Sequence, residues 1–243
     1  MNLPNNFSVD ELPWGHVKLV QNPDNFCYGI DAVLLADFAR CKKNSRCVDL
    51  CSGNGAGAFL MAAKYPSIKI STLEIQKELS QLADISVELN SFENRISVYN
   101  GDLKNCLNFF EKNTFNCVTV NPPYMTGQIQ KNEKEGLAIA RHEICCNLEN
   151  VLSASDTLLN SSGDFYMIHR ANRLDDIFSA CEKTHITVKE IRLVYPSENK
   201  DATMVLVHGK KSALKGMSVL PALTVYDRTG VYSEEVQKIY SSC

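Results

Sequence analysis

The sequence predicts an α/β protein whose sheet is doubly wound and mostly parallel. Short apolar runs rich in Val and Ile alternate with longer segments of helical period. A glycine-rich turn, SGNGAG, directly follows one of the apolar runs and precedes a helical segment. Polar residues recur where the predicted strands end, and this edge of such a sheet binds ligands. The 243 residues suit one large domain, and the apolar fraction of 44% is enough for a buried core.

Seven predicted strands form the sheet: 46–50, 68–73, 96–99, 115–120, 165–169, 188–194 and 203–207. The predicted helices are 58–65, 77–90, 142–159, 173–183 and 232–240. The last two strands are separated only by the turn YPSENKD, which is too short for a crossover, so we expect them to be antiparallel. A short strand at 17–20 and a helix at 30–40 form a predicted N-terminal cap, residues 1–45. Residues 46–243 are then the main domain with a short C-terminal extension.

The composition limits the classes of protein to which this chain can belong. The net charge of −3 argues against a non-specific nucleic-acid binder but not against an enzyme that acts on one folded RNA, which would need a local basic patch. The ten cysteines contain no Cys-x-x-Cys pair and no Cys/His cluster at zinc spacing, so we expect reduced thiols and no metal site. No run approaches the ~20 apolar residues that cross a bilayer, and the first residues do not resemble a signal peptide. We expect a cytoplasmic protein without a membrane partner; the sequence indicates no oligomeric state.

A ligand crevice is predicted after the first three strands of the sheet. Asp49, Gly53 and Gly55 surround the glycine turn, where a ligand can approach the backbone at a helix N-terminus. Glu74 ends the next strand, where its carboxylate can accept from both hydroxyls of a ribose. Asp102, after the third strand, can accept from the exocyclic amine of an adenine. Together these groups suit an adenosine ligand without a phosphate, because Asp49 would repel a pyrophosphate.

Each of these residues also has a structural interpretation. Glycines in a strand-to-helix turn often serve packing alone, and the pattern departs from G-x-G-x-x-G because Gly57 comes one residue early. Glu74 can be an exposed turn acid or a helix N-cap, and Asp102 a solvated acid in a Gly-Asp turn. The prediction of a ligand crevice therefore depends on all of these residues occurring together and not on any one of them.

The sequence Asn121-Pro122-Pro123-Tyr124 is the most specific feature of the chain. Two prolines after a buried strand end the ladder and fix the backbone with exposed carbonyls. The Asn121 side-chain oxygen and the Pro122 carbonyl can hold a planar nitrogen by two acceptors while Tyr124 stacks on the attached ring. Such acceptors favour the positive charge that develops when the nitrogen attacks a methyl donor, so no general base is needed. The alternative is a rigid strand exit with a half-exposed tyrosine.

With this motif, residues 46 to about 208 resemble class I S-adenosylmethionine-dependent methyltransferases of the amino-methylating NPPY type. The resemblance implies a Rossmann-like fold with S-adenosylmethionine as the cofactor. It also implies that Asp49 and the glycine turn hold the methionine and sugar end, Glu74 the ribose and Asp102 the adenine amine. Asn121 and Tyr124 would hold the target, and Asn121 would also border the cofactor.

Nearly the whole chain resembles the bacterial tRNA(Val) adenine(37)-N6-methyltransferase family. The resemblance is carried by NFCYGIDAVLLADFA, VDLCSGNG, VTVNPPY, AIARHE, VYPSENKDATMVLV and LPALTVYDRTGVYSEEVQKIY. It implies a tRNA substrate, methylated at N6 of an adenine next to the anticodon. It also implies that the YGIDAVLL segment folds over the cofactor, so that Asp31 touches the methionine end. The other interpretation of Asp31 is a plain helix cap.

Three alternatives stay open at this point. The same motif resembles that of protein glutamine methyltransferases acting on release factors, although these have a sizeable helical domain before the glycine turn. Adenine methylation of ribosomal RNA or DNA presents the same amine to Asn121 and Tyr124. A binding scaffold that has lost catalysis is the non-enzyme alternative, against which intact Asn121 and Tyr124 argue.

Candidate RNA contacts follow the motif and recur further on, although charged residues on loops and helix faces are usually just solvated surface charges. The first group is Lys131, Arg141 and His142, and the others are Lys134, Arg170, Arg173, Lys210, Lys211 and Lys215. Arg141 also has Glu143 nearby as an ion-pair partner.

Overall fold

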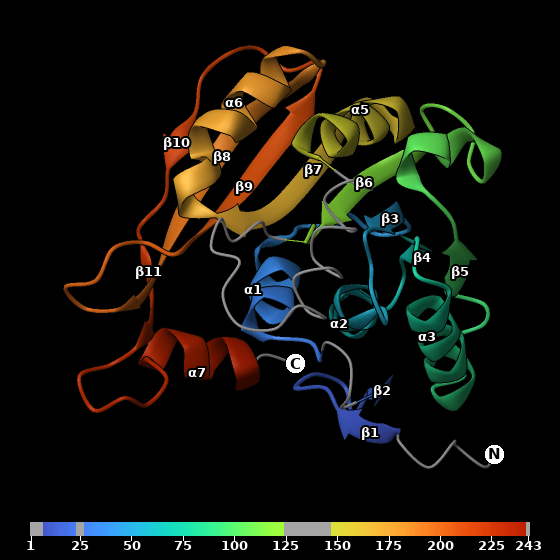
Figure 1. Cartoon of the computed structure of the whole chain (residues 1–243), viewed down its shortest axis with the longest axis horizontal. Helices are drawn as coiled ribbons and strands as arrows, with labels where there is room; N and C mark the ends of the chain where they lie inside the picture. Colours follow the sequence, from blue (N-terminus) through green and yellow to red (C-terminus); the bar gives the residue numbers. More distant parts are fainter. Residues whose placement is uncertain (1–6, 23–26, 124–146, 242–243) are drawn as a thin grey trace, which may run out of the picture.

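A computed structural model describes residues 7–22, 27–123 and 147–241. Its main sheet has the strand order β10-β8-β9-β7-β6-β3-β4-β5, and β11 pairs with β8 beside this path (Figure 1). The strands are β3 (Arg46–Leu50), β4 (Lys69–Glu74), β5 (Ile96–Asn100), β6 (Phe115–Val120), β7 (Leu159–Arg170), β8 (Ile186–Ser197), β9 (Met204–Lys211), β10 (Ser218–Val219) and β11 (Leu223–Tyr226). Strands β3 to β7 are mutually parallel, and β9 is antiparallel to both β7 and β8. The predicted parallel sheet with an antiparallel last pair is confirmed.

Helices cover both faces of the sheet (Figure 1). The α-helices are α1 (Ile30–Phe38), α2 (Ala56–Lys64), α3 (Lys77–Leu89), α5 (Leu148–Leu158), α6 (Leu174–Glu182) and α7 (Glu234–Ser241), and the short 3-10 helices are η1 (Leu103–Asn108) and η2 (Ala171–Arg173). One apolar cluster joins α1, α2 and α7 to one face, and a second joins η1, α5 and α6 to the other. Because side chains alternate along a strand, Cys47 and Asp49 face α1 and α2, whereas Val48 and Leu50 face the second cluster.

The N-terminal hairpin packs against α3. Strands β1 (Ser8–Glu11) and β2 (Lys18–Gln21) form a separate antiparallel sheet. The Val20 N–H donates to Ser86 Oγ of α3 at 2.9 Å, and Lys18 exchanges two hydrogen bonds with the Asn90 side chain. The buried Trp14 Nε1–H donates to the Ile239 carbonyl of α7 at 2.7 Å, which joins the two ends of the described chain.

Some boundaries differ from the prediction. The sheet has two more strands than the seven expected, because the short β10 and β11 add to the outer edge of β8. The segment SSGD, expected as a turn, lies inside β7, where Ser162 takes a left-handed φ of 64° and the pairing with β6 shifts register. The predicted helix 142–159 is seen as α5, and residues 142–146 lie outside the described residues.

The proposed domain boundary after residue 45 stays a prediction. Helix α1 lies before that boundary, yet its Val33, Leu34 and Leu35 are buried in the same cluster as α2 and the sheet. The part of the chain predicted as a cap therefore contributes to the common core. Within the described residues, no helix has both the length and the apolar character that crossing a membrane requires.

Candidate active site

Asp49 lies at the carboxyl end of β3, beneath the glycine turn that opens α2. Its side chain is buried, and Oδ1 accepts a 2.7 Å hydrogen bond from Thr119 Oγ1 of the neighbouring strand β6. The Ala58 N–H in the first turn of α2 also stabilises the ionised carboxylate. Burial nevertheless raises the pKa of Asp49 to about 7, and the negative charge of Glu74 adds to the increase. These contacts join the first turn of α2 to β6.

Glu74 ends β4 and binds the backbone of two neighbouring loops. Its Oε2 accepts from the Gly53 N–H at 2.9 Å, and Oε1 accepts from the Gln76 N–H at 2.9 Å. The side chain is only 5% exposed. A carboxylate offers about four lone-pair directions. The carboxylate therefore fixes the glycine turn while it retains capacity for further donors.

Asp102 follows β5 and caps a helix. Its Oδ1 accepts from the Lys104 N–H at 2.9 Å, which makes it the N-cap of η1, and Lys104 Nζ lies 3.3 Å from Oδ2. The preceding Gly101 is packed so closely that an added Cβ would come within 2.2 Å of the Phe109 ring. The structure thus gives Asp102 a capping role, and its contact with an adenine amine stays a prediction.

Asn121 and Asp31 meet at the carboxyl edge of the sheet. Asn121 follows β6 directly, and Asp31 lies in the first turn of α1. The Asn121 Nδ2 donates to Asp31 Oδ2 at 2.9 Å, and Asp31 is only 8% exposed. An ionised carboxylate only accepts, so this bond fixes which end of the Asn121 amide faces Asp31. The N-cap of α1 is Gly29, so the interpretation of Asp31 as a plain helix cap is wrong, and its side chain instead orients the asparagine of the NPPY motif.

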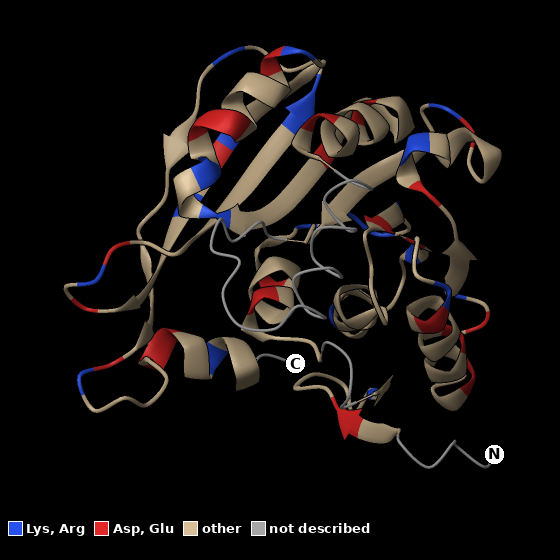
Figure 2. Ribbon diagram, in the orientation of Figure 1, with Lys and Arg blue, Asp and Glu red and all other residues tan. Residues whose placement is uncertain are grey.

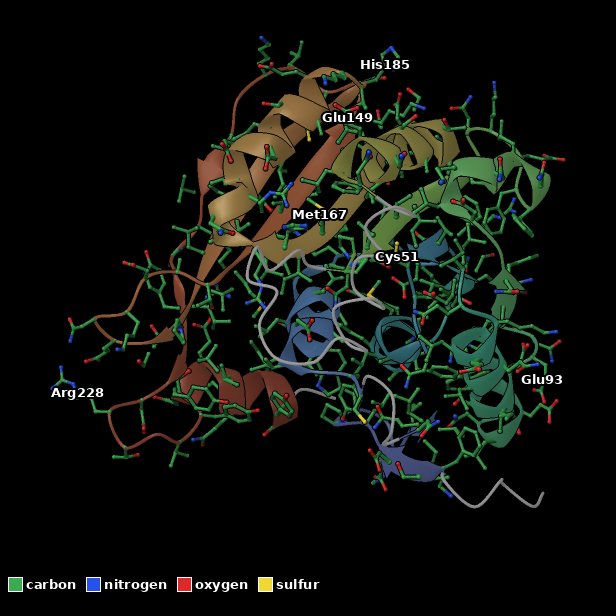
Figure 3. The ribbon with its side chains drawn as sticks, in the orientation of Figure 1. Cys51, Glu93, Glu149, Met167, His185 and Arg228 are labelled. Carbon is green, nitrogen blue, oxygen red and sulfur yellow. The ribbon has the colours of Figure 1, made fainter. Side chains whose placement is uncertain are left out.

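These residues gather where four parallel strands end. Thr119 is the register partner of Asp49, and Asn121 lies two residues further along the chain, directly after β6. Cys51 of the glycine turn adopts a left-handed φ of 54° directly after β3 and lies near the middle of the molecule in Figure 3. The predicted crevice residues at the ends of β3, β4, β5 and β6 thus lie along one edge of the sheet.

A model of the methyltransferase small domain family matches residues 17–189, which is more than half of the chain. The protein belongs to this family. Membership confirms the predicted class of enzyme, an S-adenosylmethionine-dependent methyltransferase.

Relatives agree with this assignment, and solved structures share the fold. Proteins named tRNA1(Val) (adenine(37)-N6)-methyltransferase include one from Porphyromonas gingivalis, 22% identical over 219 residues, which covers 87% of this chain and 86% of the relative. Another, from Phocaeicola vulgatus, is 25% identical over 207 residues and covers 85% of this chain and 86% of the relative. A predicted O-methyltransferase from Agrobacterium tumefaciens has a TM-score of 0.72 at 23% identity, covering 86% of this chain and 95% of that one. A geranyl diphosphate methyltransferase solved with S-adenosylmethionine has a TM-score of 0.55 at 10% identity, over 74% of this chain and 84% of that one.

The glycine turn of this methyltransferase fits a bound S-adenosylmethionine. Gly53 has a left-handed φ of 57°, and a Cβ added there would meet no described atom within 4 Å. Open space above a backbone N–H is what a ligand needs for close approach. Beside it, the buried Ser52 Oγ has no hydrogen-bond partner among residues 7–22, 27–123 and 147–241. A ligand with hydroxyl and amino groups would supply such a partner.

Gly55 has a different role from Gly53. Its φ is 87°, and an added Cβ would lie 2.9 Å from the Phe59 ring. Gly55 therefore allows α2 to begin close beneath the turn, so it supports the cofactor site through packing.

Several predicted target contacts lie outside the described residues. These are Tyr124, Lys131, Lys134, Arg141 and His142. Their roles stay predictions. Pro122, the other predicted acceptor, is described and buried.

Two of the remaining basic candidates lie at the carboxyl edge. Arg170 ends β7, which runs parallel to β6, and Arg173 lies in η2 just after it. Basic positions appear in Figure 2 where β7 leads into α6. The Arg173 side chain forms an ion pair with Asp176. Both arginines are therefore on the same edge as Asn121.

The late lysines are placed elsewhere. Lys210 and Lys211 end β9, and because β9 is antiparallel to β7 they lie at the opposite edge of the sheet. Lys210 Nζ is 3.2 Å from Asp164, and Lys211 Nζ is 3.5 Å from Asp156. Lys215 is exposed beyond β9. The sheet thus separates Lys210 and Lys211 from the candidate site.

Sequence reasoning missed the polar support of the glycine turn. Asn54 is buried and donates to the Val20 carbonyl at 3.4 Å and to Gln21 Oε1 at 3.5 Å. Gln21 is 2% exposed, and its side chain also contacts Asp10 and the Tyr28 N–H. Asn54 lies within the turn motif, but its partner in β2 has no sequence signal.

Proposed function

We propose that this methyltransferase transfers a methyl group from S-adenosylmethionine to N6 of adenine 37 in tRNA(Val). Relatives bearing this activity in their names match along 85–87% of the chain. Within the site, the observation that carries the proposal is the hydrogen bond from Asn121 to Asp31. It places an amide of fixed orientation next to the glycine turn, as methylation of an exocyclic amine requires.

The residues around the glycine turn would hold the cofactor. The Gly53 backbone and the Ser52 hydroxyl border the space available to the methionine end. Glu74, fixed by the Gly53 and Gln76 N–H groups, would accept from the ribose hydroxyls, and Asp102 from the adenine amine. When bound, S-adenosylmethionine supplies an electrophilic methyl group on a positively charged sulfur.

The target amine would be held by the NPPY motif. Because the Asn121 NH₂ group donates to Asp31, its amide oxygen is the atom that accepts from the amine. The Pro122 carbonyl would accept the other N–H, and Tyr124 would stack on the base. These acceptors would stabilise the positive charge that develops on the nitrogen during attack. The methylated nitrogen would then lose its extra proton to solvent. Much of the rate then comes from positioning the nitrogen against the methyl group.

The test combines the wild-type protein with Asn121→Ala and a matched control, Asn108→Ala, at an exposed position of η1. Each is supplied with methyl-labelled S-adenosylmethionine and, separately, with unmodified tRNA, ribosomal RNA, DNA and a release factor. We expect N6-methyladenosine in valine tRNA from the wild type and from Asn108→Ala, with loss of at least about 100-fold in Asn121→Ala. Mass spectrometry of nuclease digests locates the modified base.

Other products would change the assignment in specific ways. Label in glutamine of the release factor would favour the protein methyltransferase, and label in ribosomal RNA or DNA would keep the chemistry but change the substrate. If no substrate is labelled and calorimetry detects no binding of S-adenosylmethionine, the protein is a scaffold.

A further inference from the structure

Three cysteines converge on the face of the sheet that packs against α1 and α2. The Sγ atoms of Cys41, Cys47 and Cys117 all lie within 4.8 Å of one another, and those of Cys41 and Cys47 are 3.5 Å apart. Cys47 in β3 and Cys117 in β6 are register partners on adjacent parallel strands, so both side chains point to the same face. Cys41, three residues after the end of α1, completes the triangle.

The sulfur spacing is that of a metal–thiolate centre. With a metal–sulfur bond of about 2.3 Å, three thiolates around one ion are separated by about 3.8 Å in tetrahedral and about 4.0 Å in trigonal geometry. The observed spacing includes these values, so only side-chain adjustments are needed to enclose an ion. Such sulfur ligands select soft ions, such as Cu(I) and Zn(II), over Mg²⁺ and Ca²⁺.

The cysteine cluster is reachable from solvent, and its thiols affect one another's ionisation. Cys47 and Cys117 are each 2% exposed, whereas Cys41 is only partly buried and provides a route from solvent. The S–H groups of Cys117 and Cys47 lower the pKa of Cys41, and Lys64 contributes to the lowering. The contact with Cys41 and burial raise the pKa of the Cys47 and Cys117 thiols. A bound cation would offset the cost of ionising these sulfurs.

We propose that Cys41, Cys47 and Cys117 form a binding site for one soft, thiophilic metal ion held by three thiolate sulfurs. The site is separate from the candidate active site, because Cys47 precedes Asp49 by two positions and lies one pleat, about 7 Å, closer to the amino edge of the sheet. A three-coordinate ion such as Cu(I) would be saturated by this set, whereas Zn(II) would add one ligand from solvent. The inference departs from the expectation of no metal site, which rested on sequence spacing alone.

The test uses the full chain, reduced and freed of metal. Cu(I) is titrated in competition with a chromophoric chelator, and Zn(II) affinity is measured by competition with Cd(II), whose thiolate complexes absorb in the ultraviolet. We expect one equivalent of one of these ions to bind, and the affinities to decide which. Cys41→Ser, Cys47→Ala and Cys117→Ala should each weaken binding by more than about 100-fold, since losing a group that only hydrogen-bonds to a metal ligand already costs about 10- to 100-fold.

Controls separate ligation from thiol content and from folding. Cys106→Ala and Cys181→Ala remove buried thiols outside the cluster and should bind as the wild type does. A Cys145→Ser/Cys146→Ser double variant should also retain binding. In the wild type, the metal should protect Cys41 from alkylation at least about 10-fold while the exposed Cys27 reacts equally with and without metal. This measurement needs no variant and remains valid if a substitution in the sheet prevents folding.

Three results would overturn the proposal. One is equal affinity for metal in the wild type and in the triple variant of the cluster. Another is the absence of stoichiometric binding by the reduced wild type, and the third is alkylation of Cys41 at the same rate with and without metal. Formation of a Cys41–Cys47 disulfide by mild oxidants, without metal binding, would instead make the cluster a redox-sensitive thiol pair.

Discussion

The side chain of Asn121 donates a 2.9 Å hydrogen bond to Asp31, a residue 90 positions earlier in the chain. Asp31 is largely buried at the start of α1, so the two side chains face each other away from bulk solvent. A carboxylate in this position orients the Asn121 amide directly after β6. The contact links the N-terminal segment to the chemistry proposed for the NPPY motif.

Asp31→Ala should slow methyl transfer by about 10- to 100-fold, which corresponds to losing a hydrogen bond to a charged group, about 1.5–3 kcal/mol. Asp31→Asn should lose less, because its amide oxygen still accepts from Asn121. The measurement is kcat and KM with valine tRNA, together with the Kd for S-adenosylmethionine by calorimetry. A positioning role lowers kcat and leaves the cofactor Kd within about threefold. If Asp31→Ala instead raises the cofactor Kd more than about tenfold while kcat at saturating cofactor is unchanged, Asp31 contacts the cofactor directly.

Gly53→Ala and Gly55→Ala should separate ligand approach from packing. At position 55 an alanine would have to adopt the left-handed φ of Gly55 and would clash with Phe59, so we expect a loss of about 2–4 kcal/mol in the free energy of unfolding. Alanine at Gly53 has the backbone strain alone, about 1 kcal/mol, but its methyl group enters the space beside Ser52. We therefore expect Gly53→Ala to raise the Kd for S-adenosylmethionine by at least about 10-fold. Urea unfolding and calorimetry measure the two effects, and equal losses of stability in both variants would contradict the distinction.

Asp49 should make the unfolding free energy depend on pH. Its pKa is raised to about 7 in the folded protein, so between about pH 4 and pH 7 the folded state holds a proton that the unfolded state releases. Stability from this group is therefore greatest at low pH and falls as pH rises through that range, by at most about 1.4 kcal/mol per unit, and is constant above it.

The measurement is the difference in unfolding free energy between the wild type and Asp49→Asn across this range. The difference is needed because His169 acts in the opposite direction: burial and the charge of Arg173 lower its pKa to about 4, so stability from the neutral imidazole is lost as pH falls from about 6.5. Subtraction removes this common contribution. A pH-independent difference would show that Asp49 is ionised throughout.

Binding of tRNA should depend on the carboxyl edge of the sheet. Arg173→Gln should weaken the binding of valine tRNA several-fold. It should also lower the slope of log Kd against log salt concentration by about 1. Lys131→Glu and Arg141→Glu should have the same direction of effect. Lys210→Gln at the opposite edge is the matched control and should leave both quantities unchanged. If Arg173→Gln and Lys210→Gln have the same affinity for tRNA and the same salt dependence, Arg173 at the carboxyl edge does not contact the tRNA.

Local sequence patterns were sufficient for most of the fold and part of the site. The strand Phe115–Val120 was predicted at its observed bounds, because buried apolar residues precede two prolines that cannot continue the ladder. The glycine turn and the acids Asp49, Glu74 and Asp102 were found because parallel strands present their carboxyl ends at one edge. The outermost strands β10 and β11 were missed, since two to four residues give little periodicity and their pairing depends on β8.

The sequence by itself determined the class of fold, the edge that holds the ligands and the residue types that face them, because strand period, glycine turns and proline are encoded locally. Only the tertiary structure decided which distant groups meet. It paired Asp31 with Asn121, assigned Asp49 to Thr119 and the glycine turn, and separated Lys210 from the arginines at the other edge. It also brought together Cys41, Cys47 and Cys117, six and seventy positions apart. Such contacts depend on register between strands and on helix packing, and neither is specified within any short stretch of sequence.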